Sequence, residues 1–417
     1  MQSLLVLYLA GQLLLPGHIE HVIGFVPFRT GIEAITGPLS TQALATQIFG
    51  LYVGLVYFTP LAGGWLGDRV LRRTGAVVLG GLLMTAGHFC MAFDASFLLA
   101  LLLLILGAGA LRGNLQPQMG ELYDRHDRRR DIAFQIYGAT VNLAAFISPL
   151  ATGALGQAYG WHVGFGFAGF GMLIGLMIYL VAGRRVGLNR ARVISGPKGP
   201  TPPLSRNERK IVLHLLGIIP ITTLFWIAQS QVWNTYNLWV RDHVELVFGG
   251  WTMPVPWLQS LDGLAPFVLL PPILVLWRRQ AKSGREPPET TKIAIGCFIF
   301  AVATLWLAAA GWAVDAHART PLPWVIAFHV VSNAGWLFFA PTVSALYSRM
   351  GPTSVNATLI GCNSVAVFLG SVISGRLGGL YEALPSWQFW GLHAALVGLG
   401  GFLMLLMGAR LRRAFGA

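Results

Sequence analysis

Apolar residues run along this chain in long uninterrupted stretches, and polar and charged residues gather in short segments between them. An α-helix rises about 1.5 Å per residue, so about 20 apolar residues cross a bilayer core of roughly 30 Å. The pattern therefore predicts an all-α integral membrane protein with about twelve transmembrane helices, the first of them short. The spans are expected near residues 1–15, 41–66, 76–93, 95–118, 132–157, 161–183, 211–240, 255–277, 292–312, 322–348, 353–380 and 386–409.

The basic residues fall in alternate segments between the predicted spans. Cytoplasmic loops of membrane proteins carry an excess of lysine and arginine, so this side and both termini are predicted to be cytoplasmic. The net charge of +13 is spread over separate loops, whereas nucleic-acid binding needs one contiguous basic face, so no nucleic-acid partner is expected. Most of the 29 lysine and arginine residues lie in segments 69–73, 125–130, 184–210, 278–292 and 410–413.

The longest polar segment divides the chain into two halves. Residues 184–210 are rich in proline, glycine and arginine and lack apolar periodicity, which indicates a cytoplasmic linker. It would join an N-terminal six-helix bundle, residues 1–183, to a C-terminal six-helix bundle, residues 211–417. The three cysteines have no zinc-ligand spacing, so neither a metal nor another cofactor is expected. The chain is interpreted as a monomer in the lipid bilayer.

The segment 16–40, predicted to lie outside the cell, is long enough for a small interfacial helix. His18, Glu20 and His21 within it are three potential metal ligands in four positions. A metal site needs further placed ligands, so a solvated polar loop is the preferred interpretation.

A glycine-rich charged segment joins the second and third predicted spans. Its glycines allow neighbouring helix backbones to approach closely, its aspartate can pair with a basic group or a helix end, and its arginines face the aqueous interior. Short basic loops are common on this side of any membrane protein, which is the alternative reading. The combination resembles the loop between the second and third helices of major facilitator superfamily transporters, where it serves as a cytoplasmic hinge. The hinge residues are Gly63, Gly64, Gly67, Asp68, Arg69, Arg72 and Arg73.

Five further segments make the resemblance more specific. They occur in the order 107–150, 159–176, 225–239, 257–264 and 284–296. Together they resemble the proton-dependent oligopeptide transporter family of the same superfamily, and the resemblance extends from Met1 to the last predicted helix. It implies two six-helix bundles that alternate the access to a site between them. It also implies proton-coupled symport of di- and tripeptides or similar small solutes across a bacterial inner membrane.

Two ionisable residues inside predicted spans are the strongest candidates for function, because a charge in a membrane is costly unless it is paired or hydrated. Arg112 stands where the family has a lysine that holds the substrate carboxylate, and an arginine keeps its charge but cannot release a proton. Asp262 stands where the family usually has an asparagine. It could form a gating pair with Arg112, or accept a substrate amine or a proton. The alternatives are a snorkelling arginine and an aspartate at a helix end.

The resemblance also implies a substrate pocket, although each of its polar residues could equally serve helix packing. Where the family has a glutamate in the seventh helix this chain has Ser230, and where it has a glutamate in the tenth helix this chain has Trp336. Neither side chain carries a proton. His329 and His88 are therefore candidate proton carriers beside Arg112 and Asp262, with histidines that serve packing as the alternative. The implied pocket residues are Tyr57, Arg112, Asn142, Trp226, Asp262, Trp336 and Asn363, the last in place of a tryptophan.

The start of the chain departs from the family as well. The ExxERFxYYG motif that opens the first helix of the family is absent, and Met1 resembles the position directly after it. The sequence therefore predicts a truncated first helix or a misplaced start. An enzyme is not expected, because the spans lack a nucleophile, a metal set or paired carboxylates. The remaining rivals are a non-transporting membrane receptor or scaffold, and a transporter of another solute without proton coupling.

Overall fold

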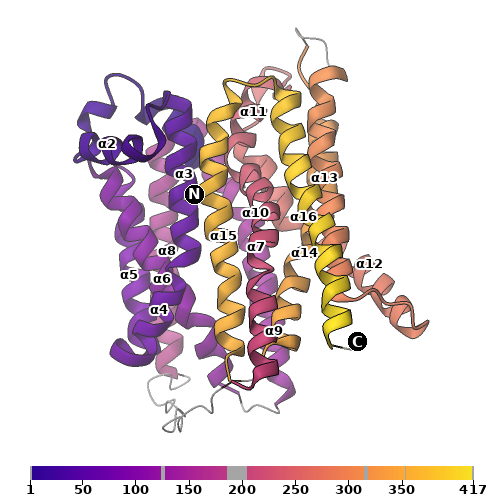
Figure 1. The fold of residues 1–417 in the computed structure, drawn as a ribbon. Helices are drawn as coiled ribbons and strands as arrows, with labels where there is room; N and C mark the ends of the chain where they lie inside the picture. Colours follow the sequence, from indigo (N-terminus) through magenta and orange to yellow (C-terminus); the bar gives the residue numbers. More distant parts are fainter. Residues whose placement is uncertain (1, 124–126, 186–203, 314–317, 353, 416–417) are drawn as a thin grey trace. The chain divides into compact units, whose positions relative to one another are not determined.

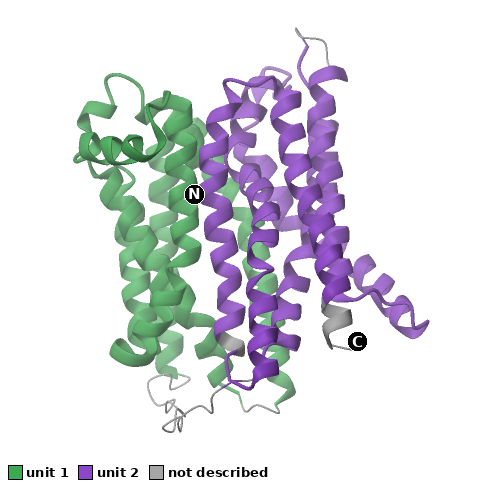
Figure 2. Ribbon diagram, in the orientation of Figure 1, with its two compact units in different colours: residues 1–199 green, residues 200–417 purple. Residues whose placement is uncertain are grey.

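The structure of this chain is a computed structural model that describes residues 2–123, 127–185, 204–313, 318–352 and 354–415. The described chain is almost entirely helical and divides into two compact units, residues 1–199 and 200–417 (Figures 1 and 2). The division falls inside the predicted linker, of which residues 186–203 lie outside the described part.

The helices of the N-terminal unit pack closely through small residues. The elements of this unit are α1 (Gln2–Tyr8), the π-helical turn η1 (Leu9–Leu13), the 3-10 turn η2 (Ile19–His21), α2 (Phe25–Thr36), α3 (Thr41–Phe58), α4 (Pro60–Leu66), the π-helical turn η3 (Gly67–Leu71), α5 (Arg72–Cys90), the 3-10 turn η4 (Asp94–Ser96), α6 (Phe97–Glu121), α7 (Arg128–Tyr159) and α8 (Trp161–Arg185). A Cβ atom added to Gly80 of α5 would lie 2.7 Å from the carbonyl oxygen of Gly107 in α6. Only glycine permits this approach, which increases the dispersion contacts along both helices.

The C-terminal unit follows the same packing principle. Its elements are α9 (Arg206–Leu216), α10 (Ile219–Trp233), α11 (Thr235–His243), the antiparallel strands β1 (Val247–Phe248) and β2 (Trp251–Thr252), the 3-10 turn η5 (Val255–Gln259), α12 (Ser260–Lys282), α13 (Glu289–Ala313), α14 (Leu322–Met350), α15 (Asn356–Gly378), the 3-10 turn η6 (Gly379–Tyr381) and α16 (Ser386–Phe415). A Cβ atom on Gly296 of α13 would lie 2.8 Å from the carbonyl oxygen of Gly335 in α14, and the reverse distance is also 2.8 Å. The two glycines therefore bring these helices together.

The apolar helices agree with the predicted spans. Among the described residues, ten helical runs are long and apolar enough to cross a membrane. One of them, Thr41–Cys90, contains 50 residues and covers the second and third predicted spans. The first span is short as predicted, because its apolar helix covers Leu4–Leu13. The prediction of an all-α, multi-span membrane protein is confirmed.

The predicted span over residues 211–240 is wrong at its C-terminal end, because the apolar helical run Arg206–Trp233 stops before Asn234. Three helices, α9, α10 and α11, cover this region. Between α9 and α10 the backbone of Gly217 and Ile218 stays in the right-handed helical region, and Pro220 lies in the first turn of α10, where its missing N–H group is not needed. At Asn234 the backbone leaves the helical region, with φ −107° and ψ −105°. The predicted linker also extends too far, because Ser205 and Glu208 form a capping box that starts α9.

Residues 63–66 of the glycine-rich segment 63–73 lie in α4, inside the predicted span 41–66, whereas residues 67–71, which were expected in the following loop, form the π-helical turn η3. Helix α4 continues into η3, and the chain changes direction only at Arg72, which has a φ of 57°. The close approach predicted for the glycines is confirmed. A Cβ atom on Gly63 would lie 2.0 Å from the carbonyl oxygen of Gly109 in α6. The small residues of this segment therefore serve helix packing first.

Ion pairs attach this segment to the end of α6. The carboxylate of Asp68 lies 3.0 Å from the guanidinium of Arg73, and Arg73 Nε lies 3.2 Å from the carboxylate of Glu121. Arg69 and Arg72 are exposed. The aspartate thus has the basic partner that the sequence suggested, and a partly exposed pair of this kind contributes little stability by itself.

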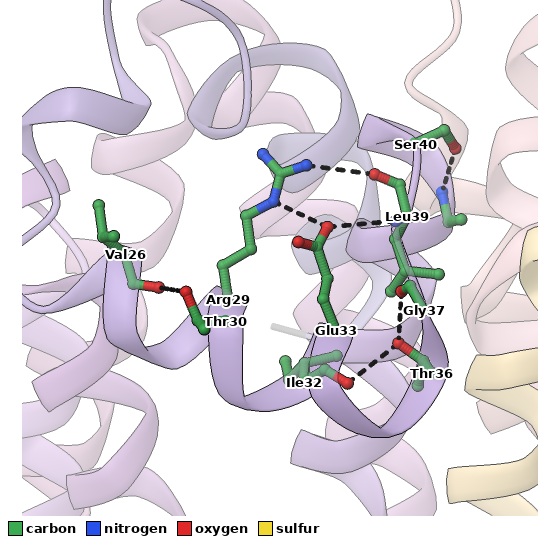
Figure 3. Close-up of polar contacts among 10 residues, drawn as sticks. Val26, Arg29, Thr30, Ile32, Glu33, Thr36, Gly37, Leu39 and Ser40 are labelled. Carbon is green, nitrogen blue, oxygen red and sulfur yellow. Dashed lines mark hydrogen bonds and ion pairs between the residues drawn. The ribbon is translucent and has the colours of Figure 1, made fainter.

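Segment 16–40 contains the small helix that its length suggested, α2. The Glu33 carboxylate accepts hydrogen bonds from Arg29 Nε at 2.9 Å and from the Leu39 amide at 3.1 Å (Figure 3). Arg29 also donates to the Leu39 carbonyl oxygen at 3.3 Å (Figure 3). These contacts fix the turn between α2 and α3. They lower the pKa of Glu33, chiefly through the amide of Leu39 and then through Arg29.

The lowered pKa of Glu33 predicts an acid-sensitive turn. A carboxylate of this kind stabilises the folded state above its ordinary pKa of 4.5, and that contribution is lost as the pH falls through the lower folded value. We expect residues 37–40 to lose protection from hydrogen exchange in this acid range, after correction for intrinsic exchange. Glu33→Gln should remove the acid response, whereas Glu20→Gln, outside this turn, should keep it. An unchanged acid response in Glu33→Gln would contradict the assignment.

Candidate functional site

An ionisable pair lies inside the C-terminal unit, between α12 and α14. Asp262 is roughly two turns into the helical run Val255–Lys282. Its Oδ1 lies 2.8 Å from Nδ1 of His329 and 2.7 Å from Nδ2 of Asn333. The His329 side chain is 1% exposed and that of Asp262 is 21% exposed. Asp262 lies in the first turn of α12, and its carboxylate turns towards α14.

The hydrogen bonds of His329 allow its ring to hold or release a proton without moving. An ionised carboxylate only accepts hydrogen bonds, so this network assigns a hydrogen on Nδ1 that points to Asp262. Nε2 lies 2.9 Å from the hydroxyl oxygen of Tyr236, which donates to a neutral ring and accepts from a charged one. Oδ2 of Asp262 has no hydrogen-bond partner among the described residues. The network thus has two places for one further proton, the ring and the open carboxylate oxygen.

Sequence reasoning named two members of this network and missed the other two. Asp262 and His329 were separate candidates, and the structure brings them into direct contact. Asn333 follows His329 by one helical turn on the same face of α14, a signal that was present in the sequence. Tyr236 carried no such signal, because α11 is a separate helix after the break at Asn234.

Neutral contacts occupy the place where the resemblance implies a glutamate in the seventh helix. Ser230 Oγ lies 3.0 Å from Ser371 Oγ. The amide nitrogen of the neighbouring Gln231 lies 2.9 Å from the carbonyl oxygen of Ser374 and 3.1 Å from His393 Nε2. These bonds join α10 to α15 and α16 without a titratable acid. The histidine accepts there, because its Nδ1 contacts the carbonyl oxygen one turn earlier.

Arg112 is a charged residue on α6 of the N-terminal unit. It is exposed, and its guanidinium carbon lies 5.3 Å from the ring centroid of Tyr57. Such a cation–π contact stabilises an exposed arginine by about 0.5–1 kcal/mol. Within the described residues of this unit the guanidinium has no carboxylate partner, so its N–H donors are available to an anion. A gating pair between Arg112 and Asp262 would join the two units and stays a prediction.

Two other predicted pocket residues have mainly helix contacts. Asn142 Nδ2 donates to the carbonyl oxygen of Gly138 in its own helix at 3.0 Å. Trp226 is buried, and its ring contacts those of Phe225 and Phe339 edge to face. The Nε1 of Trp226 has no hydrogen-bond partner among the described residues. Packing therefore accounts for much of what these side chains do.

The remaining candidates lie apart from the Asp262 network. Trp336 and Asn363 are half-buried on α14 and α15, and Asn363 Oδ1 has no partner in the described part of the chain. His88 belongs to the N-terminal unit, where it is buried and its Nδ1 has no described partner. No group of three or more histidine, cysteine, aspartate or glutamate side chains that could hold a metal occurs among the described residues.

Long apolar helices in two units, with charged side chains among them, define a multi-pass membrane protein. The chain belongs to the POT family, whose family model matches residues 74–190 and 204–388. It is 25% identical over 432 residues to an uncharacterized transporter of Bacillus subtilis (strain 168), with 90% of this chain and 87% of the relative covered. It is 26% identical over 416 residues to a peptide transporter of Yersinia enterocolitica subsp. palearctica serotype O:3 (strain YE-P4), with 81% and 80% covered.

A solved structure shows the same fold. It is the crystal structure of a mutant of the peptide transporter POT in complex with alafosfalin. The TM-score is 0.83 over 99% of this chain and 91% of that chain, at 23% sequence identity. The predicted family and the predicted major facilitator architecture are therefore confirmed.

Proposed function

We propose that this protein is a secondary active transporter that moves small peptides or peptide-like solutes together with protons by alternating access. The observation that carries the proposal is the Asp262–His329–Tyr236 network. It is a half-buried carboxylate and a buried histidine, both hydrogen-bonded and with room for one proton. This network would perform the coupling for which the family uses the glutamates that Ser230 and Trp336 replace.

Arg112 would hold the acidic group of the solute. A guanidinium forms two parallel hydrogen bonds with a carboxylate, and the stack on Tyr57 holds it in place without using its N–H donors. Asn142 and Trp226 would line the path of the solute, together with Trp336 and Asn363. The gating pair of Arg112 with Asp262 remains part of the proposal.

The relatives support the substrate class. The relative from Yersinia is named a peptide transporter, and the solved neighbour is a peptide transporter with alafosfalin bound. The alternation of basic segments supports a multi-pass location in a bacterial inner membrane with both termini in the cytoplasm. We take the working unit to be a monomer in the lipid bilayer.

The proposal is tested by uptake into proteoliposomes with a panel of di- and tripeptides. An inward proton gradient should drive accumulation of at least one peptide, and a protonophore should abolish it. Absence of flux and of peptide-dependent stabilisation across the panel would favour the receptor or scaffold. Peptide exchange that ignores the gradient would favour a transporter without proton coupling.

Arg112→Ala tests the proposed role of the guanidinium. Charged hydrogen bonds contribute about 1.5–3 kcal/mol, so the apparent affinity for a peptide should fall by about tenfold or more. The loss should be smaller for a peptide whose carboxyl group is amidated, because that peptide lacks the partner of Arg112. Arg128→Ala is the control, since Arg128 is exposed at the start of α7. Unchanged transport by Arg112→Ala would remove Arg112 from the site.

A further inference from the structure

A second cluster of titratable side chains lies in the N-terminal unit, around Asp94. The Asp94 carboxylate accepts a hydrogen bond from the Tyr8 hydroxyl. It also lies 2.9 Å from Nδ1 of His18 and 3.3 Å from Nε2 of His162. These partners come from α1, from the segment before η2 and from the first turn of α8. One carboxylate therefore connects the first helix and the segment after it to the rest of the unit.

The cluster is buried on one side and open to water on the other. Tyr8 is 1% exposed, and its ring packs edge to face on those of His162 and Phe165. The side chains of His18 and His162 are 42% and 33% exposed, and that of Asp94 is 16% exposed. Protons from the medium can thus reach the histidines, whereas the Tyr8 hydroxyl is fixed inside the unit.

The two contacts of His162 place its Nε2 next to an acceptor, the Asp94 carboxylate, and a neutral ring has no hydrogen to offer there. Nδ1 lies 3.2 Å from the carbonyl oxygen of Met91, which only accepts, so Nδ1 carries a hydrogen. In a neutral ring Nε2 would then carry a lone pair 3.3 Å from the Asp94 carboxylate, which also only accepts, and no hydrogen bond joins the two atoms. A proton added to Nε2 replaces this repulsion by the attraction of a charged ring to the carboxylate. His18 has no such conflict, because its single contact with Asp94 suits a neutral ring.

We propose that His162 and Asp94 form a proton-binding site in the N-terminal unit, separate from the Asp262 network. When the site is filled, it fastens α1 and the segment before η2 to η4 and α8. When it is empty, the His162 contact is lost, and Tyr8 and His18 alone hold Asp94. In the orientation given by the basic loops the cluster lies outside the cytoplasm, so acid in the outer medium would tighten the first helix. Other titratable groups on the packed elements include Glu20 and His21 on η2, His88 and Cys90 at the end of α5, and Tyr159 at the end of α7.

The pH dependence of thermal unfolding tests the site in the full-length protein without any transport measurement. Histidine changes charge between about pH 5 and pH 8, so wild type and His162→Gln are compared at both ends of this range. Glutamine can donate to Asp94 but does not titrate. The stabilisation of wild type over His162→Gln should be larger at the acid end by about 2 °C or more. His21→Gln, which alters an exposed histidine on η2, should show no pH-dependent difference from wild type.

Asp94→Asn is the second variant. It keeps an oxygen that can accept the hydrogen bond of Tyr8 but removes the carboxylate charge, so the stabilisation of wild type over this variant should also be larger at the acid end. A difference from wild type that is equal at both pH values, or larger at the alkaline end, would overturn the proposal. A readout that needs no variant is hydrogen exchange of peptides covering residues 2–24 in wild type. After correction for intrinsic exchange, their protection should rise at the acid end. Protection that does not rise would also overturn the proposal.

Discussion

Asp262→Asn is expected to lower proton-driven peptide accumulation by at least about tenfold, the scale of a coupling free energy between two ligand sites. Exchange of peptide without a gradient should stay close to that of wild type. Asparagine has the size of aspartate and offers an oxygen to His329 and Asn333, so the hydrogen-bonded contact with α14 remains. The substitution removes the negative charge and the carboxylate oxygen Oδ2, which has no hydrogen-bond partner among the described residues and could take a proton.

Comparison of driven uptake with counterflow in proteoliposomes separates the two roles that Asp262 could have. Loss of both activities would assign Asp262 to the amine of the peptide, and unchanged driven uptake would exclude it from coupling. Asp242→Asn is the matched control. Asp242 lies 2.7 Å from the neighbouring Arg241 in an exposed ion pair on α11. It should transport like wild type, because such surface pairs contribute little.

Gly63→Ala is expected to cause the largest loss of stability from a single methyl group. The added Cβ would lie 2.0 Å from the carbonyl oxygen of Gly109 and 2.8 Å from the amide nitrogen of Ala110. These are backbone atoms that no change of rotamer can move, so α4 and α6 must separate. Overpacking of this kind costs about 1–3 kcal/mol or more, and the unfolding midpoint should fall by roughly 5 °C or more.

Gly138→Ala is the matched control for this substitution. Gly138 is also helical and in the same unit, but a Cβ there would meet nothing within 4 Å. Alanine forms helix more readily than glycine, so the midpoint should stay the same or rise slightly. Thermal unfolding of purified protein measures both variants. Equal midpoints for Gly63→Ala and Gly138→Ala would show that α4 and α6 pack less tightly than described.

The spans could be predicted from the sequence because their cause is local. A run of about 20 apolar residues gains enough transfer free energy to enter a bilayer whatever its neighbours do. The close contact at Gly63 was predicted for the same reason, since a residue without a side chain marks a place where backbones meet. The helical turn over residues 67–71, after the end of the predicted span, was not predicted, because the apolar pattern does not distinguish a helix that continues as a π-helical turn from one that stops.

The end of the helix at Asn234 could not be predicted, because it depends on a single residue inside an apolar stretch. Residues 211–240 have the length and composition of one span, so the apolar pattern predicts a single helix there. The departure of the backbone at Asn234 has no signature in the pattern of apolar positions. It places Tyr236 on a new helix, where its hydroxyl contacts His329.

The sequence by itself determined that this chain spans a membrane many times, which family it resembles, and that Ser230 and Trp336 stand where that resemblance implies glutamates. These follow from residue identity and order, which the sequence states directly. Only the tertiary structure decided which polar side chains meet. Asp262 is 67 positions from His329, and Asp94 is 68 positions from His162. Contacts over such distances arise from the packing of whole helices, and small residues at the helix interfaces set that packing.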